Sequence, residues 1–108
     1  MNERDLLKQH ILNLNEKSQA WMDAAPEGEF RMGVIYDDMD IDNRMNDYGV
    51  KTPADWDAIT AWENYYDVYK AYNNVRPRWT KWSDKTAEEW EREIELLGLR
   101  KHYEQLRD

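Results

Sequence analysis

Residues 52–74 read TPADWDAITAWENYYDVYKAYNN, and the rest of the expected fold is arranged around them. Thr52 followed by Pro53 is typical of a helix start, because Thr caps the first turn and Pro is tolerated at the first helical position. Asn73 and Asn74 are typical of a helix end, since Asn adopts the left-handed conformation that stops helices. Apolar side chains between these ends cover more than one narrow stripe. We therefore predict a central helix that contacts neighbours on two sides.

A second helix is expected at the beginning of the chain, from Asn2 to about Ala24. Its apolar stripe recurs at spacings of four and three and consists of Leu7, Ile11, Leu14, Ser18 and Trp21. This spacing places the side chains on one helix face. Pro26 and Gly28 then end the helix.

A third helix is expected to start at Thr86. Thr86 and Glu89 have the spacing of a capping box, in which each side chain bonds the other residue's backbone N–H. Trp90, Ile94 and Leu97 are predicted to face inward from this helix. Gly98 interrupts the pattern, so we expect a kink or a break there.

The segment between the first two helices is ambiguous. Phe30, Met32, Val34 and Tyr36 alternate with other residues, which is a strand pattern, but the chain offers no second such segment. A lone strand leaves backbone groups unpaired, so it must pair in a hairpin, pair across a dimer, or be an ordered loop. We favour a loop or short hairpin, followed by an acidic turn over residues 37–46. The prediction is a single, mainly α domain over residues 1–108, with about three helices around an aromatic-rich core and a short irregular or β segment between helices one and two.

The composition limits the classes of function. Six Trp and seven Tyr supply enough buried area for a small core. The chain contains no Cys, so disulfides and thiolate chemistry are excluded. The N-terminal residues lack the apolar run of a secretory signal. No apolar run approaches the roughly 18 residues that cross a bilayer. We expect a soluble cytoplasmic protein without a membrane partner.

The chain is acidic, with a net charge of −8. This charge disfavours general binding to nucleic acid. The acids most able to form a phosphate-like negative surface are Asp37, Asp38, Asp40, Asp42, Asp47, Asp55 and Asp57. The spacing of Asp38, Asp40 and Asp42 matches the opening of a calcium loop, but Asn43 and Gly49 occupy the positions that need Gly and Glu. We therefore predict no metal site, and a solvated acidic loop is the simplest interpretation.

Residues 70–85 read KAYNNVRPRWTKWSDK and reverse the charge of the chain, with five basic residues and one acid. The predicted contact residues of this basic aromatic loop are Arg76, Arg78, Trp79, Lys81 and Trp82. Guanidinium groups grip phosphate or carboxylate, and indoles stack on bases. An internal role is the alternative, in which the arginines pair with acids such as Asp67 and the tryptophans close the core.

Catalysis has little support. The two histidines, His10 and His102, belong to no recognisable motif, and Ser18 and Ser83 are the only serines. The chain also lacks a Gly-rich phosphate loop. We predict that the protein is not an enzyme and uses no cofactor.

Residues 67–79 read DVYKAYNNVRPRW and are followed by the capped segment Thr86–Trp90. This arrangement resembles small, mostly uncharacterised phage and prophage proteins, in which Tyr-Lys precedes a Gly, any residue and Arg-Pro-Arg. Asn74 stands at the Gly position. The resemblance covers residues 67–97 and implies phage origin. By analogy with other small acidic phage proteins, it implies inhibition of host enzymes, including defence enzymes, some by DNA mimicry.

These observations predict a small acidic binding protein that engages, and inhibits or modulates, a host macromolecule. The expected partner is a host protein with a basic surface that meets the acidic residues. One alternative is a nucleic-acid or nucleotide binder that uses the basic aromatic loop. Another is a homo-oligomeric accessory protein, such as a dimer joined through the first helix.

Overall fold

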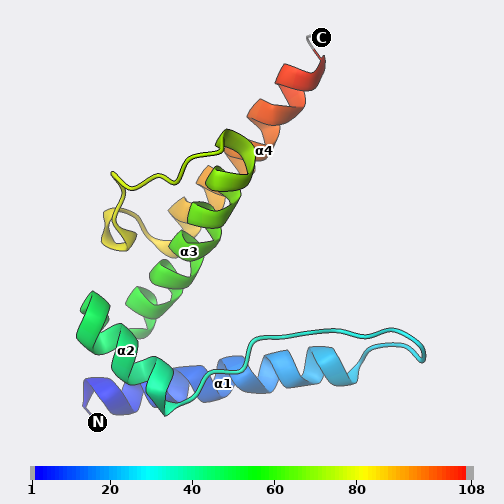
Figure 1. Ribbon diagram of the computed structural model, residues 1–108. Helices are drawn as coiled ribbons and strands as arrows, with labels where there is room; N and C mark the ends of the chain where they lie inside the picture. Colours follow the sequence, from blue (N-terminus) through cyan, green and yellow to red (C-terminus); the bar gives the residue numbers. More distant parts are fainter. Residues whose placement is uncertain (1, 107–108) are drawn as a thin grey trace. The chain divides into compact units, whose positions relative to one another are not determined.

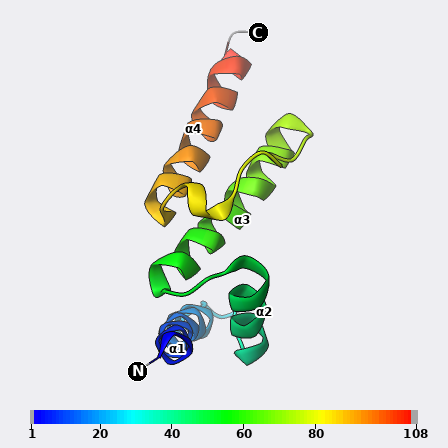
Figure 2. The same ribbon diagram turned by 90° about the vertical axis from the view of Figure 1, so that its left-hand side faces the viewer.

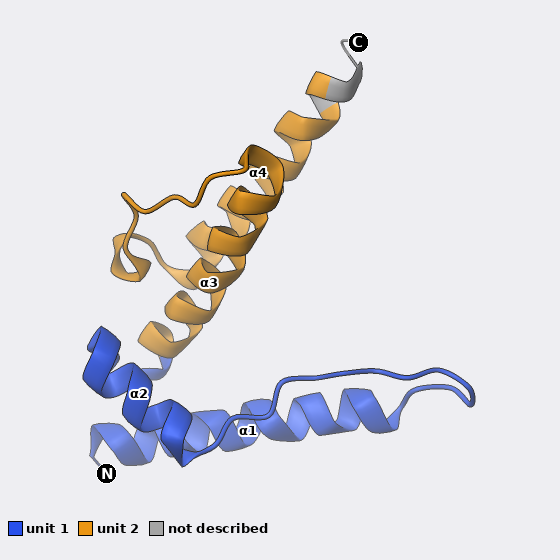
Figure 3. Cartoon of the chain, in the orientation of Figure 1, with its two compact units in different colours: residues 1–53 blue, residues 54–108 orange. Residues whose placement is uncertain are grey.

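The computed structural model describes residues 2–106, which form two compact units, unit 1 up to Pro53 and unit 2 from Ala54 (Figure 3). In this part of the chain the elements are α1 (Glu3–Asp23), α2 (Asp38–Tyr48), α3 (Pro53–Asn73), the 3-10 turn η1 (Trp82–Asp84) and α4 (Ala87–Leu106) (Figure 1). The mainly α class is confirmed. The expected count of three helices is wrong, because the described residues form four. The single domain stays a prediction.

The additional helix, α2, replaces the predicted acidic turn. Asp37 begins it with a reciprocal capping box: the Asp40 N–H donates to the Asp37 carboxylate at 3.0 Å, and the Asp37 N–H donates to the Asp40 carboxylate at 2.8 Å. Gly49, with φ of 72°, ends it in the left-handed conformation. Aspartates at the start of a helix also face the positive end of its dipole. The aspartates from Asp37 to Asp40 therefore start a helix, and a prediction based on their charge alone does not identify it.

The segment expected to be irregular or β contains no strand within the described residues. After Asp23 the chain turns and runs back along α1 as the α1–α2 linker, residues 24–37 (Figure 1). The Asn15 amide holds this linker at two points, donating to the Tyr36 carbonyl and accepting from the Tyr36 N–H, both at 2.8 Å. Gly33 lies against Ser18 and Met22 of α1. A side-chain amide of α1 thus occupies the place that a neighbouring strand would take.

Unit 1 consists of α1, the linker and α2. Leu7 and Ile11 of the predicted α1 stripe are buried, whereas Trp21 is exposed. Two ion pairs join α1 to α2: Arg4 with Asp42 at 3.1 Å, and Lys8 with Asp38. The two helices pack on each other, and α1 keeps the bounds expected from its stripe.

Unit 2 is built on α3. The loop after α3 doubles back along it, so that α4 runs in the same general direction as α3 (Figures 1 and 2). The core between the helices contains Ala61, Tyr65, Trp90 and Leu97. The rings of Tyr65 and Trp90 lie 5.0 Å apart. This cluster confirms an aromatic core in unit 2.

Local signals at the ends of α3 and α4 are confirmed. Asn74 has φ of 62° after the last turn of α3. The capping box of α4 is formed by the Thr86 N–H donating to Glu89 at 3.1 Å and the Glu89 N–H donating to Thr86 at 3.2 Å. A break at Gly98 is wrong, because α4 continues through it to Leu106, whereas the alternative of a kink stays a prediction. A helix tolerates a single Gly at a modest cost of about 1 kcal/mol.

Candidate functional site

The loop between α3 and α4, residues 74–81, is fastened to α3 at its centre. Pro77 is fully buried. The Thr80 hydroxyl donates to the Pro77 carbonyl at 2.7 Å and accepts from the Trp62 indole N–H at 2.9 Å. A hydroxyl that both donates and accepts in this way fixes the loop backbone against the helix. This part of the basic aromatic loop is structural.

Arg76 also turns toward α3. Its guanidinium lies 3.4 Å from the Asp67 carboxylate and 5.2 Å from the centre of the Tyr66 ring. Asp67 was among the acids expected to pair internally with the arginines. The ion pair is exposed and long, so it contributes little stability. It does fix the direction of the Arg76 side chain.

The two tryptophans of the loop have different roles. Trp82 is half-buried, and its carbonyl accepts a hydrogen bond of 2.9 Å from the Trp90 indole. Trp79 is 67% exposed, and its ring forms a T-shaped pair with Tyr69, with ring centres 5.5 Å apart. The Trp82 backbone therefore meets the buried Trp90, whereas Trp79 stands at the surface.

A shallow hollow of 370 Å³ lies beside this loop and is lined by Lys70, Asn74, Val75, Arg76 and Arg78. We call these five residues together with Trp79 the basic aromatic rim. Three of the six side chains are cationic, and Lys70 comes from the last turn of α3. Lys81 lies outside the hollow, and its backbone N–H donates to Asp84 at 2.9 Å. The structure thus groups Arg76 and Arg78 of the predicted site with Lys70, and Trp79 follows Arg78 in the chain.

The seven acids of the predicted negative surface are divided between the units, with Asp55 and Asp57 in unit 2 and the others in unit 1. Asp37 and Asp40 form the α2 capping box. Asp38 and Asp42 pair with basic residues of α1. The hydrogen bond from Lys8 lowers the pKa of Asp38 below its ordinary value. Of the five predicted surface acids that lie in unit 1, four therefore either cap α2 or pair it with α1.

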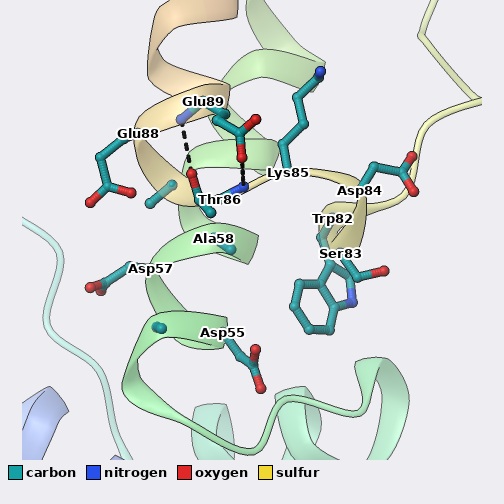
Figure 4. A pocket seen from close by; sticks show the side chains of 12 residues that line it. Asp55, Asp57, Ala58, Trp82, Ser83, Asp84, Lys85, Thr86, Glu88 and Glu89 are labelled. Carbon is teal, nitrogen blue, oxygen red and sulfur yellow. Dashed lines mark hydrogen bonds between the residues drawn. The ribbon is translucent and has the colours of Figure 1, made fainter.

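A second hollow, of 440 Å³, lies between the starts of α3 and α4 (Figure 4). Its charged residues are Asp55, Asp57, Asp84, Lys85, Glu88 and Glu89. Sequence reasoning missed it, because it depends on how two helix starts meet. Figure 4 shows Asp57 and Glu88 on one side and Asp84 on the other, while Glu89 bonds Thr86. The carboxylates do not converge on a common point.

The other polar candidates lie on different elements. His10 lies on α1 and His102 on α4, in different units. Within residues 2–106, no three His or acidic side chains are placed to hold a metal ion. Ser18 packs on the linker at Gly33.

Sequence reasoning also missed an exposed apolar surface on the α1–α2 linker. Phe30 is 85% exposed and Met32 80%, and Val34 and Ile35 are exposed as well. The signal was present in the alternating pattern that favoured a strand. The pattern did not predict which side chains of the segment contact α1.

The comparisons with known proteins give no family. Among the described helices, none is both long enough and apolar enough to cross a bilayer. No protein-family model, no curated protein and no solved structure matches this chain.

Proposed function

We propose that this chain is a non-catalytic binding protein that engages and modulates a host protein through the basic aromatic rim. The observation that carries the proposal is Trp79, a large ring that is 67% exposed on a loop fastened to its helix. Large exposed aromatic rings on fixed backbone are effective anchors, because little conformational freedom is lost when they bind. Trp and Arg are also the residues most enriched at binding hot spots.

The rim favours an acidic segment of the partner. Lys70, Arg76 and Arg78 line one hollow, and Trp79 follows Arg78 in the chain. Carboxylates of the partner would pair with the cations while Trp79 enters an apolar pocket. A protein partner is favoured over nucleic acid because the net charge of −8 repels a long polyanion.

A contact through the rim also changes the role that we propose for the acidic residues. In the sequence-based hypothesis, the acids around Asp38 meet a basic surface of the host protein. The Lys8 and Arg4 pairs neutralise much of that charge within unit 1. The rim therefore supplies the specific contacts in this proposal, and the acids contribute long-range repulsion of nucleic acid.

The test is capture of partners from nuclease-treated bacterial lysate by tagged wild-type protein and by variants, quantified by mass spectrometry. We expect Trp79→Ala and Arg78→Ala each to reduce capture of the same protein at least tenfold. Arg92→Ala is the matched control, since Arg92 is an exposed arginine on α4, outside the rim. Equal capture by Arg78→Ala and Arg92→Ala would reject the rim as the contact surface.

Binding of a labelled single-stranded oligonucleotide distinguishes the nucleic-acid alternative from a protein partner. If the rim binds nucleic acid, fluorescence anisotropy should rise at low salt and return to baseline with Arg78→Ala. The proposal predicts no rise with the wild-type protein. Binding that needs both Arg78 and Trp79 would replace the protein-partner proposal.

A further inference from the structure

One cation of the basic aromatic rim, Arg76, already holds a carboxylate. Its Nη1 donates to Oδ1 of Asp67 at 3.4 Å, and its guanidinium carbon lies over the Tyr66 ring, 5.2 Å from the ring centre. Within the described residues, neither Lys70 nor Arg78 forms an ion pair. An anion that belongs to the chain itself therefore occupies one of the cationic positions around the hollow.

The contact between Arg76 and Asp67 is weak enough to be exchanged. Its length of 3.4 Å exceeds the roughly 2.7–2.9 Å of a strong charge-assisted hydrogen bond. The Arg76 side chain is 40% exposed and that of Asp67 is 76% exposed, so water and salt screen the pair. Arg76 also lines the hollow, where the carboxylate of a partner would meet it. A carboxylate that binds in the hollow therefore replaces Asp67 at little cost.

We propose that Asp67 is an internal competitor at the rim, and that a carboxylate from an acidic segment of the partner replaces it on Arg76. The exchange rests on the proposed function, because it needs an anionic ligand in the hollow. Two carboxylates beside one guanidinium repel each other, so Asp67 lowers the affinity of the rim for such a ligand. Lys70 and Arg78 supply the first contacts, and Asp67 restricts the rim to ligands acidic enough to displace it.

The test is titration of the isotope-labelled full chain with hexaglutamate at low salt, followed by NMR at the backbone amides of Asn74 and Val75. We expect Asp67→Asn to bind hexaglutamate about threefold more tightly than the wild-type protein, because an exposed ion pair is of modest strength. Glu91→Gln is the matched control, since Glu91 is an exposed acid on α4, outside the rim, and its loss changes the net charge equally. This control should leave the affinity unchanged. Circular dichroism checks that both variants keep their helices.

A double-mutant cycle separates competition for Arg76 from the general negative charge of Asp67. In Arg76→Ala there is no guanidinium for Asp67 to occupy, so adding Asp67→Asn should bring little further gain in affinity. An equal gain with and without Arg76 would overturn the proposal, because Asp67 would then act through its charge alone. Weaker, unchanged or absent binding of hexaglutamate by Asp67→Asn would also overturn it, since Asp67 would then not compete with the ligand.

Partner capture distinguishes the internal competitor from the rim contact itself. Equal capture by Arg78→Ala and Arg92→Ala rejects the rim as the contact surface, and that result does not involve Asp67. If the rim is the contact surface, Asp67→Asn should capture more of the same host protein than the wild-type chain does. Capture that depends on Arg78 but does not increase in Asp67→Asn would overturn only the role of Asp67.

Discussion

The indole N–H of Trp90 donates a hydrogen bond of 2.9 Å to the backbone carbonyl of Trp82. Trp90 is almost fully buried in the first turns of α4, and Trp82 begins η1. One contact therefore joins the core of unit 2 to the end of the loop that carries the basic aromatic rim.

Replacing Trp90 with Phe tests this connection. Phe retains most of the apolar contact with Tyr65, but the Trp82 carbonyl loses its partner. We expect the free energy of unfolding in urea to fall by about 1–3 kcal/mol. Trp79→Phe is the control, because Trp79 is exposed, and it should change stability by less than about 0.5 kcal/mol. A similar loss in both variants would contradict the assigned role of Trp90.

Asn15→Ala tests how the linker is held. The change removes both hydrogen bonds to the Tyr36 backbone and should lower the free energy of unfolding by about 1–3 kcal/mol. Protease cleavage within residues 29–36 should become faster. Asn13→Ala is the matched control, since Asn13 is exposed on the same helix. Unchanged cleavage in Asn15→Ala would show that other contacts hold the linker.

The acid side of the stability profile should depend on Glu89. Hydrogen bonds from the Thr86 backbone and hydroxyl lower the pKa of Glu89 below its usual 4.5. A lowered pKa in the folded state gives stability that is present above pH 4.5 and is lost as the pH falls through the folded value. Glu89→Gln keeps an acceptor for the capping box but does not titrate. Urea unfolding between pH 6 and pH 3 should therefore show a shallower decline for this variant, and an identical decline would exclude Glu89 as a contributor.

Asn74 ends α3 with a positive φ of 62°. Asn74→Gly should leave the free energy of unfolding within about 0.5 kcal/mol of the wild-type value, since Gly adopts this conformation freely. Asn74→Val should destabilise by about 1–2 kcal/mol, because a branched side chain is strained there. Thermal unfolding of the two variants measures the difference. Equal stability would mean that the end of α3 shifts to avoid the strain.

Much of the local structure could be predicted from short stretches of sequence. The limits of α1 and α3, the Thr86–Glu89 capping box and the left-handed Asn74 all depend on residues within one or two turns of each other. Such signals are readable because the groups that bond are near neighbours in the chain. The Asp37–Asp40 capping box was equally local, but the surrounding acids concealed it. A helix as short as α2 is also marginal alone, so packing on α1 contributes to its stability.

The candidate site could be predicted only in part. The sequence placed Arg76, Arg78, Trp79 and Trp82 in one loop, yet it could not distinguish the exposed Trp79 from the half-buried Trp82, because both residues have similar sequence neighbours. That difference arises from where the loop meets α3, through Thr80 with Trp62 and Arg76 with Asp67. Likewise, the alternation from Phe30 to Tyr36 was visible in the sequence, but the hydrogen bonds between Asn15 on α1 and the Tyr36 backbone were not. Backbone conformation follows from neighbouring residues, whereas exposure follows from contacts between residues far apart in the chain. The sequence by itself therefore determined where most helices begin and end, and only the tertiary structure decided which side chains remain available to a partner.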